Sequence, residues 1–284
     1  MNQLAWLPDV PGLWCVIAAV VGLCVGSFLN VVIHRLPRML EQGWEDQCAE
    51  LKGEDPRERA PYNLVTPRSG CPHCGHAIGA MENIPVISYL VQRGKCRHCD
   101  GPISVRYPVV EIAAAALAVL AAWRFGPSYQ SIAIAGLLWV LLALSAIDID
   151  TQLLPDNLTL PLLWAGLIVN SFGLFVPIHD ALWGAVAGYL VLWTVYWLFR
   201  IVTGKEGMGY GDFKLLAALG AWLGWQMLPV IILFSSVVGA VVGILMILFR
   251  GRDRTIPIPF GPYLAGAGVL AIFFGKSLLA MYLG

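Results

Sequence analysis

The sequence predicts an all-α polytopic membrane protein, with about eight transmembrane helices and a long polar loop between the first two. Apolar residues make up 58% of the 284 positions and charged residues only 13%, which is far from the composition of soluble domains. The mean hydropathy is +0.72. The apolar residues are gathered in runs, and about 20 such residues in a helix cross the hydrocarbon core of a bilayer.

Eight apolar segments account for the predicted helices. They cover residues 12–33, 107–125, 131–149, 158–176, 181–202, 213–228, 230–249 and 262–282. The sixth segment is short, and we place its boundary with the seventh near Pro229. Asn170 is the main strongly polar residue deep in a segment, and we expect it to hydrogen-bond to a neighbouring helix.

Glycines four residues apart recur within these segments. Small residues at this spacing let the backbones of two helices approach closely, so we expect the pairs to lie in helix–helix contacts. The pairs are Gly22/Gly26, Gly184/Gly188, Gly220/Gly224 and Gly239/Gly243.

The distribution of positive charge predicts how the helices are oriented. No Lys or Arg precedes the first apolar segment, which is also too long for the h-region of a cleavable signal peptide. With eight crossings, segments 34–106, 203–212 and 250–261 fall on one side of the membrane. These segments and their flanks hold every Lys and Arg except Arg124 and Lys276. The positive-inside rule makes this side the cytoplasm and places the N-terminus outside.

This orientation divides the chain into three predicted parts. Residues 1–33 form the first transmembrane helix, residues 34–106 a cytoplasmic loop domain, and residues 107–284 a domain of seven transmembrane helices. Within the loop domain, residues 41–62 are mostly polar or charged, and we expect a solvated, partly mobile segment that can include a short helix. The formal net charge of 0 gives no indication of a nucleic-acid partner.

Four of the seven cysteines have the spacing of metal ligands. Cys71 and Cys74 form one C-x-x-C pair, and Cys96 and Cys99 form another after 21 intervening residues. Four thiolates can complete a closed, tetrahedral zinc site. A disulfide is the alternative, but a loop in the cytosol faces a reducing environment. We therefore predict a structural zinc that holds the loop domain together, without the nearby histidines as ligands.

Two aspartates lie where apolar segments meet polar loops. Asp148 ends the third segment and Asp212 opens the sixth, so the predicted topology places both at the cytoplasmic face. Carboxylates at membrane depth cost roughly 2.5–3.5 kcal/mol each, which indicates that they have a function. Two carboxylates that share a site cannot both ionise comfortably. One can therefore act as a base toward a water molecule while the other stays protonated.

Two further aspartates compete for this role. Asp150 is two residues from Asp148, so on a continuous helix the two side chains point to nearly opposite faces and only one can face a shared site. Asp156 follows Pro155 and precedes an apolar run, which is the position of an N-cap for the fourth helix. Asp212 could also be an N-cap, but the glycines at 207, 209 and 211 favour close backbone approach or unusual dihedral angles instead.

Five motifs in order resemble those of bacterial type IV prepilin peptidases, over nearly the whole chain. They are GSFLNVVIHRLP at 26–37, the two C-x-x-C pairs, IDID at 147–150 with LPDNLT at 154–159, GYGD at 209–212, and PFGPY at 259–263. The fourth motif matches the G-x-G-D signature of intramembrane aspartyl proteases.

This resemblance implies a bifunctional enzyme in the bacterial inner membrane. Such enzymes cut the basic leader from type IV prepilins and type II secretion pseudopilins on the cytoplasmic side. They then methylate the new N-terminus with S-adenosylmethionine. Asp148 and Asp212 match the catalytic aspartates of the family, and the four cysteines match its zinc ligands. For the methyl-transfer site, Gly94 and Lys95 are the candidates from the sequence, and an ordinary turn is the alternative for both.

Two other classes of function are considered. In an ion-coupled transporter the aspartates would bind cations, but the polar groups cluster at one membrane face rather than at mid-membrane. In a non-enzymatic assembly protein the zinc loop would bind partner proteins. Exposure of the purified protein to a prepilin separates these classes, because only the enzyme shortens and methylates it.

Overall fold

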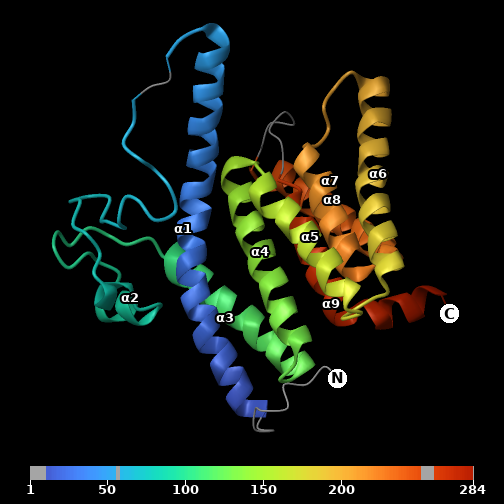
Figure 1. Cartoon of the computed structure of the whole chain (residues 1–284), viewed down its shortest axis with the longest axis horizontal. Coiled ribbons are helices and arrows are strands. Elements are labelled where there is room, and N and C mark those ends of the chain that lie inside the picture. The colour runs from blue at the N-terminus through green and yellow to red at the C-terminus, as the bar shows by residue number, and fades with distance from the viewer. Residues whose placement is uncertain (1–10, 56–57, 251–258, 284) are drawn as a thin grey trace. The chain divides into compact units, whose positions relative to one another are not determined.

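The computed structural model describes residues 11–55, 58–250 and 259–283, and this part of the chain is helical apart from loops and two isolated β-bridges. The helices follow one another through the chain (Figure 1). They are α1 (Pro11–Lys52), η1 (Ala80–Asn83), α2 (Ile87–Val91), α3 (Arg106–Phe125), α4 (Tyr129–Thr151), α5 (Asp156–Ser171), α6 (Ile178–Thr203), α7 (Tyr210–Leu223), η2 (Trp225–Met227), α8 (Leu228–Arg250) and α9 (Gly261–Leu283).

Each of the eight predicted apolar segments lies mainly in one helix, which confirms the all-α class. Among the described residues, five helices are long and apolar enough to cross a membrane, namely α1, α3, α4, α6 and α8. The other three segments lie in α5, α7 and α9. Helices α5 and α7 have 16 and 14 residues, fewer than a full crossing requires. The protein is therefore a multi-pass membrane protein whose helices differ in length.

Two predicted boundaries are wrong. The sixth segment does not continue to residue 228, because α7 ends at Leu223, where Gly224 follows with φ +83°. Helix α8 begins at Leu228, so Pro229 lies in its first turn, where the missing N–H costs nothing. The expected loop at 41–52 is also helical, since α1 continues through Pro37 to Lys52. This extension is rich in Glu, Gln and Leu, which favour helix.

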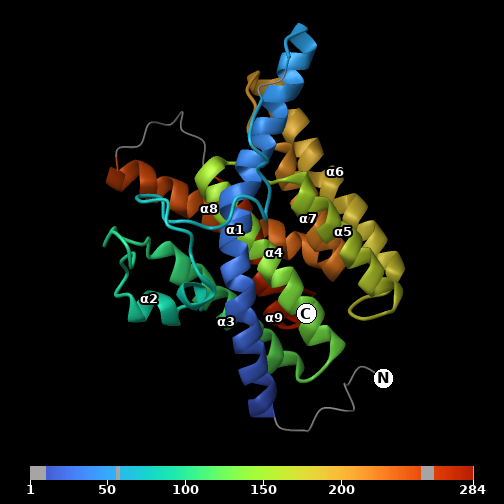
Figure 2. The same cartoon turned by 60° about the vertical axis from the view of Figure 1, so that its left-hand side comes forward.

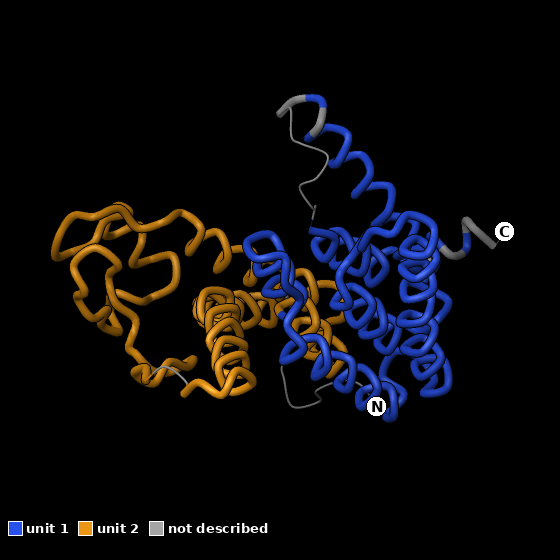
Figure 3. Tube along the Cα trace, turned by 90° about the horizontal axis from the view of Figure 1, so that it is seen from above, with its two compact units in different colours: residues 1–3, 140–284 blue, residues 4–139 orange. Residues whose placement is uncertain are grey.

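The chain divides into two compact units, which we number in chain order. The first unit ends at Trp139 and is orange in Figure 3 (its unit 2), and the second begins at Val140 and is blue (its unit 1). In the first unit, α1 packs against α3 through two of the predicted glycines. A Cβ at Gly22 would lie 2.6 Å from Cα of Ala115, and one at Gly26 would lie 2.6 Å from Cα of Glu111. The Asn30 side chain donates to the Tyr107 carbonyl at 3.1 Å. The predicted domain limits at 33 and 106 stay a prediction.

In the second unit, α7 is the most deeply buried helix. Every residue from Asp212 to Trp222 except Lys214 is buried. The backbones of Gly184 and Gly220 touch, and a Cβ at Gly188 would lie 2.7 Å from the Leu216 carbonyl oxygen. Gly184, Gly188 and Gly220 therefore lie in helix–helix contacts, as predicted, whereas Gly224 ends α7.

Asn170 joins α5 to the C-terminal end of α7. Its side-chain amide donates to the carbonyls of Ala221 at 2.8 Å and Trp222 at 3.1 Å. Its oxygen accepts from the backbone N–H groups of Phe175 and Val176. This arrangement confirms the expected helix–helix hydrogen bond, and it also closes the loop after α5.

Candidate active site and metal centre

Asp148 lies in the last turn of α4, which continues to Thr151. Because the helix continues, Asp148 and Asp150 do point in different directions. Asp148 is buried, with 4% of its surface exposed, whereas Asp150 is exposed. Of these two carboxylates, Asp148 is therefore the one directed into the unit.

The buried Asp148 carboxylate is held by the first residue of α9. The backbone N–H of Gly261 donates to Oδ2 of Asp148 at 2.8 Å. The other donors at this helix end are already used or missing: Pro262 has no N–H, and those of Tyr263 and Leu264 both donate to the Phe260 carbonyl. Gly261 therefore supplies the one backbone donor of the first α9 turn that can serve another group.

Asp212 lies in the first turn of α7, behind a turn of glycines. The N-cap of α7 is Gly209, and the Asp212 side chain is 6% exposed. The Asp148 carboxylate lies near enough for its charge to act on that of Asp212. The two aspartates are far apart in sequence, yet the fold of one unit brings their carboxylates into electrostatic range.

Leu154, in the loop between α4 and α5, packs against Gly211, which precedes Asp212, and against Gly261, which binds Asp148. A Cβ at Gly211 would lie 2.6 Å from Cβ of Leu154, and a Cβ at Gly261 would lie 3.0 Å from Cδ2 of Leu154. Glycine is needed at both positions because the neighbouring atoms leave no room for a side chain. The role of Gly261 was missed from the sequence, although its motif was noted.

The expectation that Asp156 caps α5 is wrong. The N-cap is Pro155, and Asp156 is the first helical residue. Its two carboxylate oxygens accept from Nζ of Lys214 at 2.6 and 2.7 Å. An ammonium group two residues after Asp212 attracts this carboxylate more strongly than backbone N–H groups do. The ion pair links the start of α5 to α7, outside the buried site.

The four predicted metal ligands meet in the first unit. The Sγ atoms of Cys71, Cys74, Cys96 and Cys99 all lie within 4.8 Å of one another, and this is the cysteine cluster found in the described part of the chain. Cys71 and Cys99 are 3.8 Å apart and Cys74 and Cys96 4.0 Å apart. A tetrahedral site with Zn–S bonds of about 2.3 Å has S–S edges of about 3.8 Å. The donor set therefore fits zinc, and all four thiols are free of disulfides.

The two cysteine pairs form equivalent turns. In the first, the N–H of Cys71 donates to the carbonyl of His76, and that of Gly75 donates to the carbonyl of Cys71. Cys96 and Asp100 make the same pair of bonds in the second turn. Backbone N–H groups of Cys74 and His73 stabilise the Cys71 thiolate and lower its pKa to about 6. The first turn thus favours the thiolate form of Cys71, which is the form that binds metal.

The residues around the cysteines have other partners. His76 and His98 stack with ring centroids 4.7 Å apart, and His76 faces the Glu82 carboxylate at 3.4 Å. Gly94 has φ +69°, and its N–H donates to the Tyr89 carbonyl. Lys95 pairs with Pro102 in a β-bridge. Both candidates for methyl transfer lie in a turn, and their part in that reaction stays a prediction.

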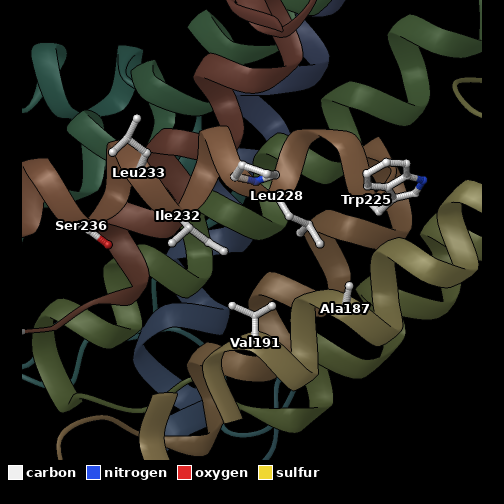
Figure 4. A pocket seen from close by; sticks show the side chains of 8 residues that line it. Ala187, Val191, Trp225, Leu228, Ile232, Leu233 and Ser236 are labelled. Atoms are coloured by element: carbon white, nitrogen blue, oxygen red, sulfur yellow. The ribbon is translucent and has the colours of Figure 1, made fainter. Parts of the chain in front are cut away.

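A groove of about 560 Å³ lies apart from the two aspartates, between α6 and the start of α8 (Figure 4). Its walls are almost wholly apolar and contain no titratable side chain. The lining residues are Ala187, Val191, Trp225, Leu228, Pro229, Ile232, Leu233 and Ser236. Such a surface in a membrane protein suits acyl chains or an apolar helix, and it offers no catalytic group.

Comparisons with known proteins find matches along the whole chain. Residues 20–125 match the bacterial peptidase A24 N-terminal domain, and residues 135–244 match the type IV leader peptidase family. Three relatives, from Stutzerimonas stutzeri, Pseudomonas aeruginosa and Aeromonas hydrophila, are each called prepilin leader peptidase/N-methyltransferase. The first is 58% identical over 100% of this chain and 98% of its own length. The second is 55% identical over 100% of this chain and 98% of its own length. The third is 55% identical over 96% of this chain and 95% of its own length. No solved structure matches it significantly.

Proposed function

Because the chain belongs to the type IV leader peptidase family, we propose that it removes the basic leader of type IV prepilins and type II secretion pseudopilins. It then methylates the new N-terminal amine. The relatives, whose names state both activities, span the full chain. The observation that carries the proposal is the approach of the buried Asp148 and Asp212 carboxylates in one unit.

In this proposal the two aspartates activate one water molecule. The ionised carboxylate takes a proton from the water, whose oxygen forms a bond to the scissile carbonyl carbon. The protonated carboxyl donates its hydrogen to the carbonyl oxygen. The tetrahedral intermediate then breaks its C–N bond, and the leaving amine takes up the proton that the first carboxylate accepted from the water. A hydroxyl of the intermediate returns its proton to the second carboxylate as the product carboxyl group forms, so the aspartate pair regains its starting protonation state. No covalent bond to the enzyme forms, which distinguishes this chemistry from that of serine and cysteine proteases.

The location of the site fits a substrate with a basic leader and an apolar helix. Asp148 and Asp212 lie at the ends of apolar helices, next to the polar segments that we assign to the cytoplasm. The leader would remain in the cytoplasm while the apolar helix lies in the bilayer, so the bond between them would reach the aspartates. The protein is accordingly placed in the bacterial inner membrane, with a periplasmic N-terminus.

The zinc has a structural role in this proposal. Cys71, Cys74, Cys96 and Cys99 would fill all four positions of a tetrahedral ion, which leaves none for substrate. Methyl transfer would use S-adenosylmethionine as the second substrate. S-adenosylmethionine supplies the methyl group that replaces a proton on the amine. Gly94 and Lys95 remain the candidate contacts for this step.

The test is cleavage of a synthetic prepilin segment by the purified full-length protein, followed by mass spectrometry. The product should lose the leader and, with S-adenosylmethionine present, gain the mass of one CH₂ group. Asp148→Asn and Asp212→Asn should each lower the cleavage rate at least about a hundredfold, with membrane insertion and zinc content unchanged. Asp150→Asn is the matched control, one helix face away. Near wild-type cleavage by Asp148→Asn would make Asp150 the better candidate.

A further inference from the structure

The short helix α2 presents an apolar face to its surroundings. Ile87, Leu90 and Val91 are 57%, 67% and 68% exposed, and residues spaced by three and four share one side of a helix. By contrast, the Gln92 side chain turns inward and donates to the carbonyl of Glu82. A helix in water normally has the opposite arrangement, with its apolar side buried.

The start of α2 is fixed to a buried carboxylate of α3. The backbone N–H of Val86, the N-cap of α2, donates to Oε2 of Glu111 at 2.7 Å. Glu111 is itself buried. Val86 has φ +60°, which is unusual for a β-branched residue. A relaxed turn would not adopt this conformation, so the hydrogen bond to Glu111 holds the start of α2 in a defined place.

Glu111 lies inside the apolar part of α3. It is five residues beyond Arg106, or about 7–8 Å along the helix, and it packs against Gly26 in the apolar part of α1. On either side of it, α3 exposes Val109 and Ile112. Figures 1 and 2 both show α2 beside the N-terminal half of α3. The N-cap of α2 thus lies level with the part of α3 that exposes apolar side chains.

We propose that α2 is an interfacial helix, with Ile87, Leu90 and Val91 inserted among the acyl chains next to α3. The segment after α2 also fits a membrane surface, because its basic residues Arg93, Lys95 and Arg97 are all exposed. Basic side chains beside an inserted apolar face bind anionic lipid headgroups. The bilayer would in this way hold the second cysteine turn, which begins at Cys96, against its surface.

Photo-crosslinking in vesicles tests the insertion. The photoreactive residue p-benzoylphenylalanine replaces Leu90 in the full-length protein, which is reconstituted in phosphatidylcholine with a minority of phosphatidylglycerol. Val65 is the matched control, because it is apolar and 82% exposed but lies in a turn next to Asn63, whose carbonyl accepts from Arg35. Illumination should give several-fold more lipid adduct at position 90 than at position 65, measured by mass spectrometry.

Equal lipid adduct at the two positions, or none at position 90, would overturn the proposal. If illuminated cell membranes then gave a protein adduct at position 90, a protein partner would occupy this face instead. The headgroup contact has its own test. Arg93→Gln, Lys95→Gln and Arg97→Gln together should abolish any gain in adduct that phosphatidylglycerol produces. A gain that persists in this variant would overturn the headgroup assignment.

Discussion

The backbone N–H of Gly261 and the carboxylate of Asp148 are joined by a hydrogen bond of 2.8 Å across 113 residues of sequence. The bond connects the first turn of α9 to the last turn of α4, and no side chain could stand in for the glycine. A Cβ at position 261 would lie 2.7 Å from Oδ2 of Asp148. The orientation of this carboxylate therefore depends on a residue that carries no side chain of its own.

Gly261→Ala should lower kcat for leader cleavage at least about tenfold, which corresponds to about 1.4 kcal/mol of lost transition-state stabilisation. The added methyl group displaces the Asp148 carboxylate and lengthens its hydrogen bond, while KM changes little because substrate binding is not involved. Steady-state kinetics with a prepilin peptide provide the measurement. Gly266→Ala is the control on the same helix, since a Cβ there meets nothing within 4 Å.

A double variant separates the two neighbours of position 261. If crowding against Leu154 were the cause, Leu154→Ala combined with Gly261→Ala would restore kcat. If the displaced Asp148 carboxylate is the cause, the double variant should stay slow. Wild-type kcat in the single variant Gly261→Ala would contradict the positioning role altogether.

Asn170→Leu should lower the free energy of unfolding by about 1–3 kcal/mol. The substitution leaves the carbonyls of Ala221 and Trp222 and the N–H groups of Phe175 and Val176 without their partner, in a buried place. Thermal unfolding in detergent, followed by circular dichroism, measures the change. Asn157→Leu serves as the comparison, because Asn157 is exposed on the same helix. Equal midpoints for the two variants would count against this account.

Removal of one cysteine ligand should release the metal. The purified wild-type chain should contain one zinc ion, whereas Cys71→Ser should lose most of it, because a structural zinc site needs four strong donors. Elemental analysis of the purified proteins measures the content. Cys48→Ser should keep its zinc, since Cys48 is an exposed free cysteine on α1 outside the cluster. A full zinc complement in Cys71→Ser would show that the ion binds elsewhere.

Lys214 and Asp156 should be energetically coupled, but only weakly. Their side chains are 25% and 52% exposed, and ion pairs in such positions contribute at most about 1 kcal/mol. A double-mutant cycle of Lys214→Met and Asp156→Asn, measured by thermal unfolding, should give a coupling of about 0.2–1 kcal/mol. Zero coupling in this cycle would contradict the contribution of the ion pair to stability.

Local patterns were sufficient for much of this protein. Apolar runs located the helices because membrane insertion depends on composition over about 20 residues, and the four cysteines were found because both metal-binding turns are local. Helical periodicity predicted that only one of Asp148 and Asp150 faces a shared site, whereas the choice of Asp148 came from the resemblance to the family. The end of α1 was missed because the polar residues after the apolar run were expected to form a loop. Many of them favour helix, so α1 continues through them to Lys52.

The remaining features depend on contacts between distant segments. The sequence contains Gly261 in a recognisable motif, but nothing local indicates that its N–H meets Asp148. The same holds for Asp156, where an N-cap and an ion pair with Lys214 are both compatible with the local pattern. By itself the sequence determined the class of protein and the approximate positions of its helices, and it supplied the candidate site residues. The tertiary structure decided which polar groups pair, because helix packing sets the distances on which hydrogen bonds and ion pairs depend.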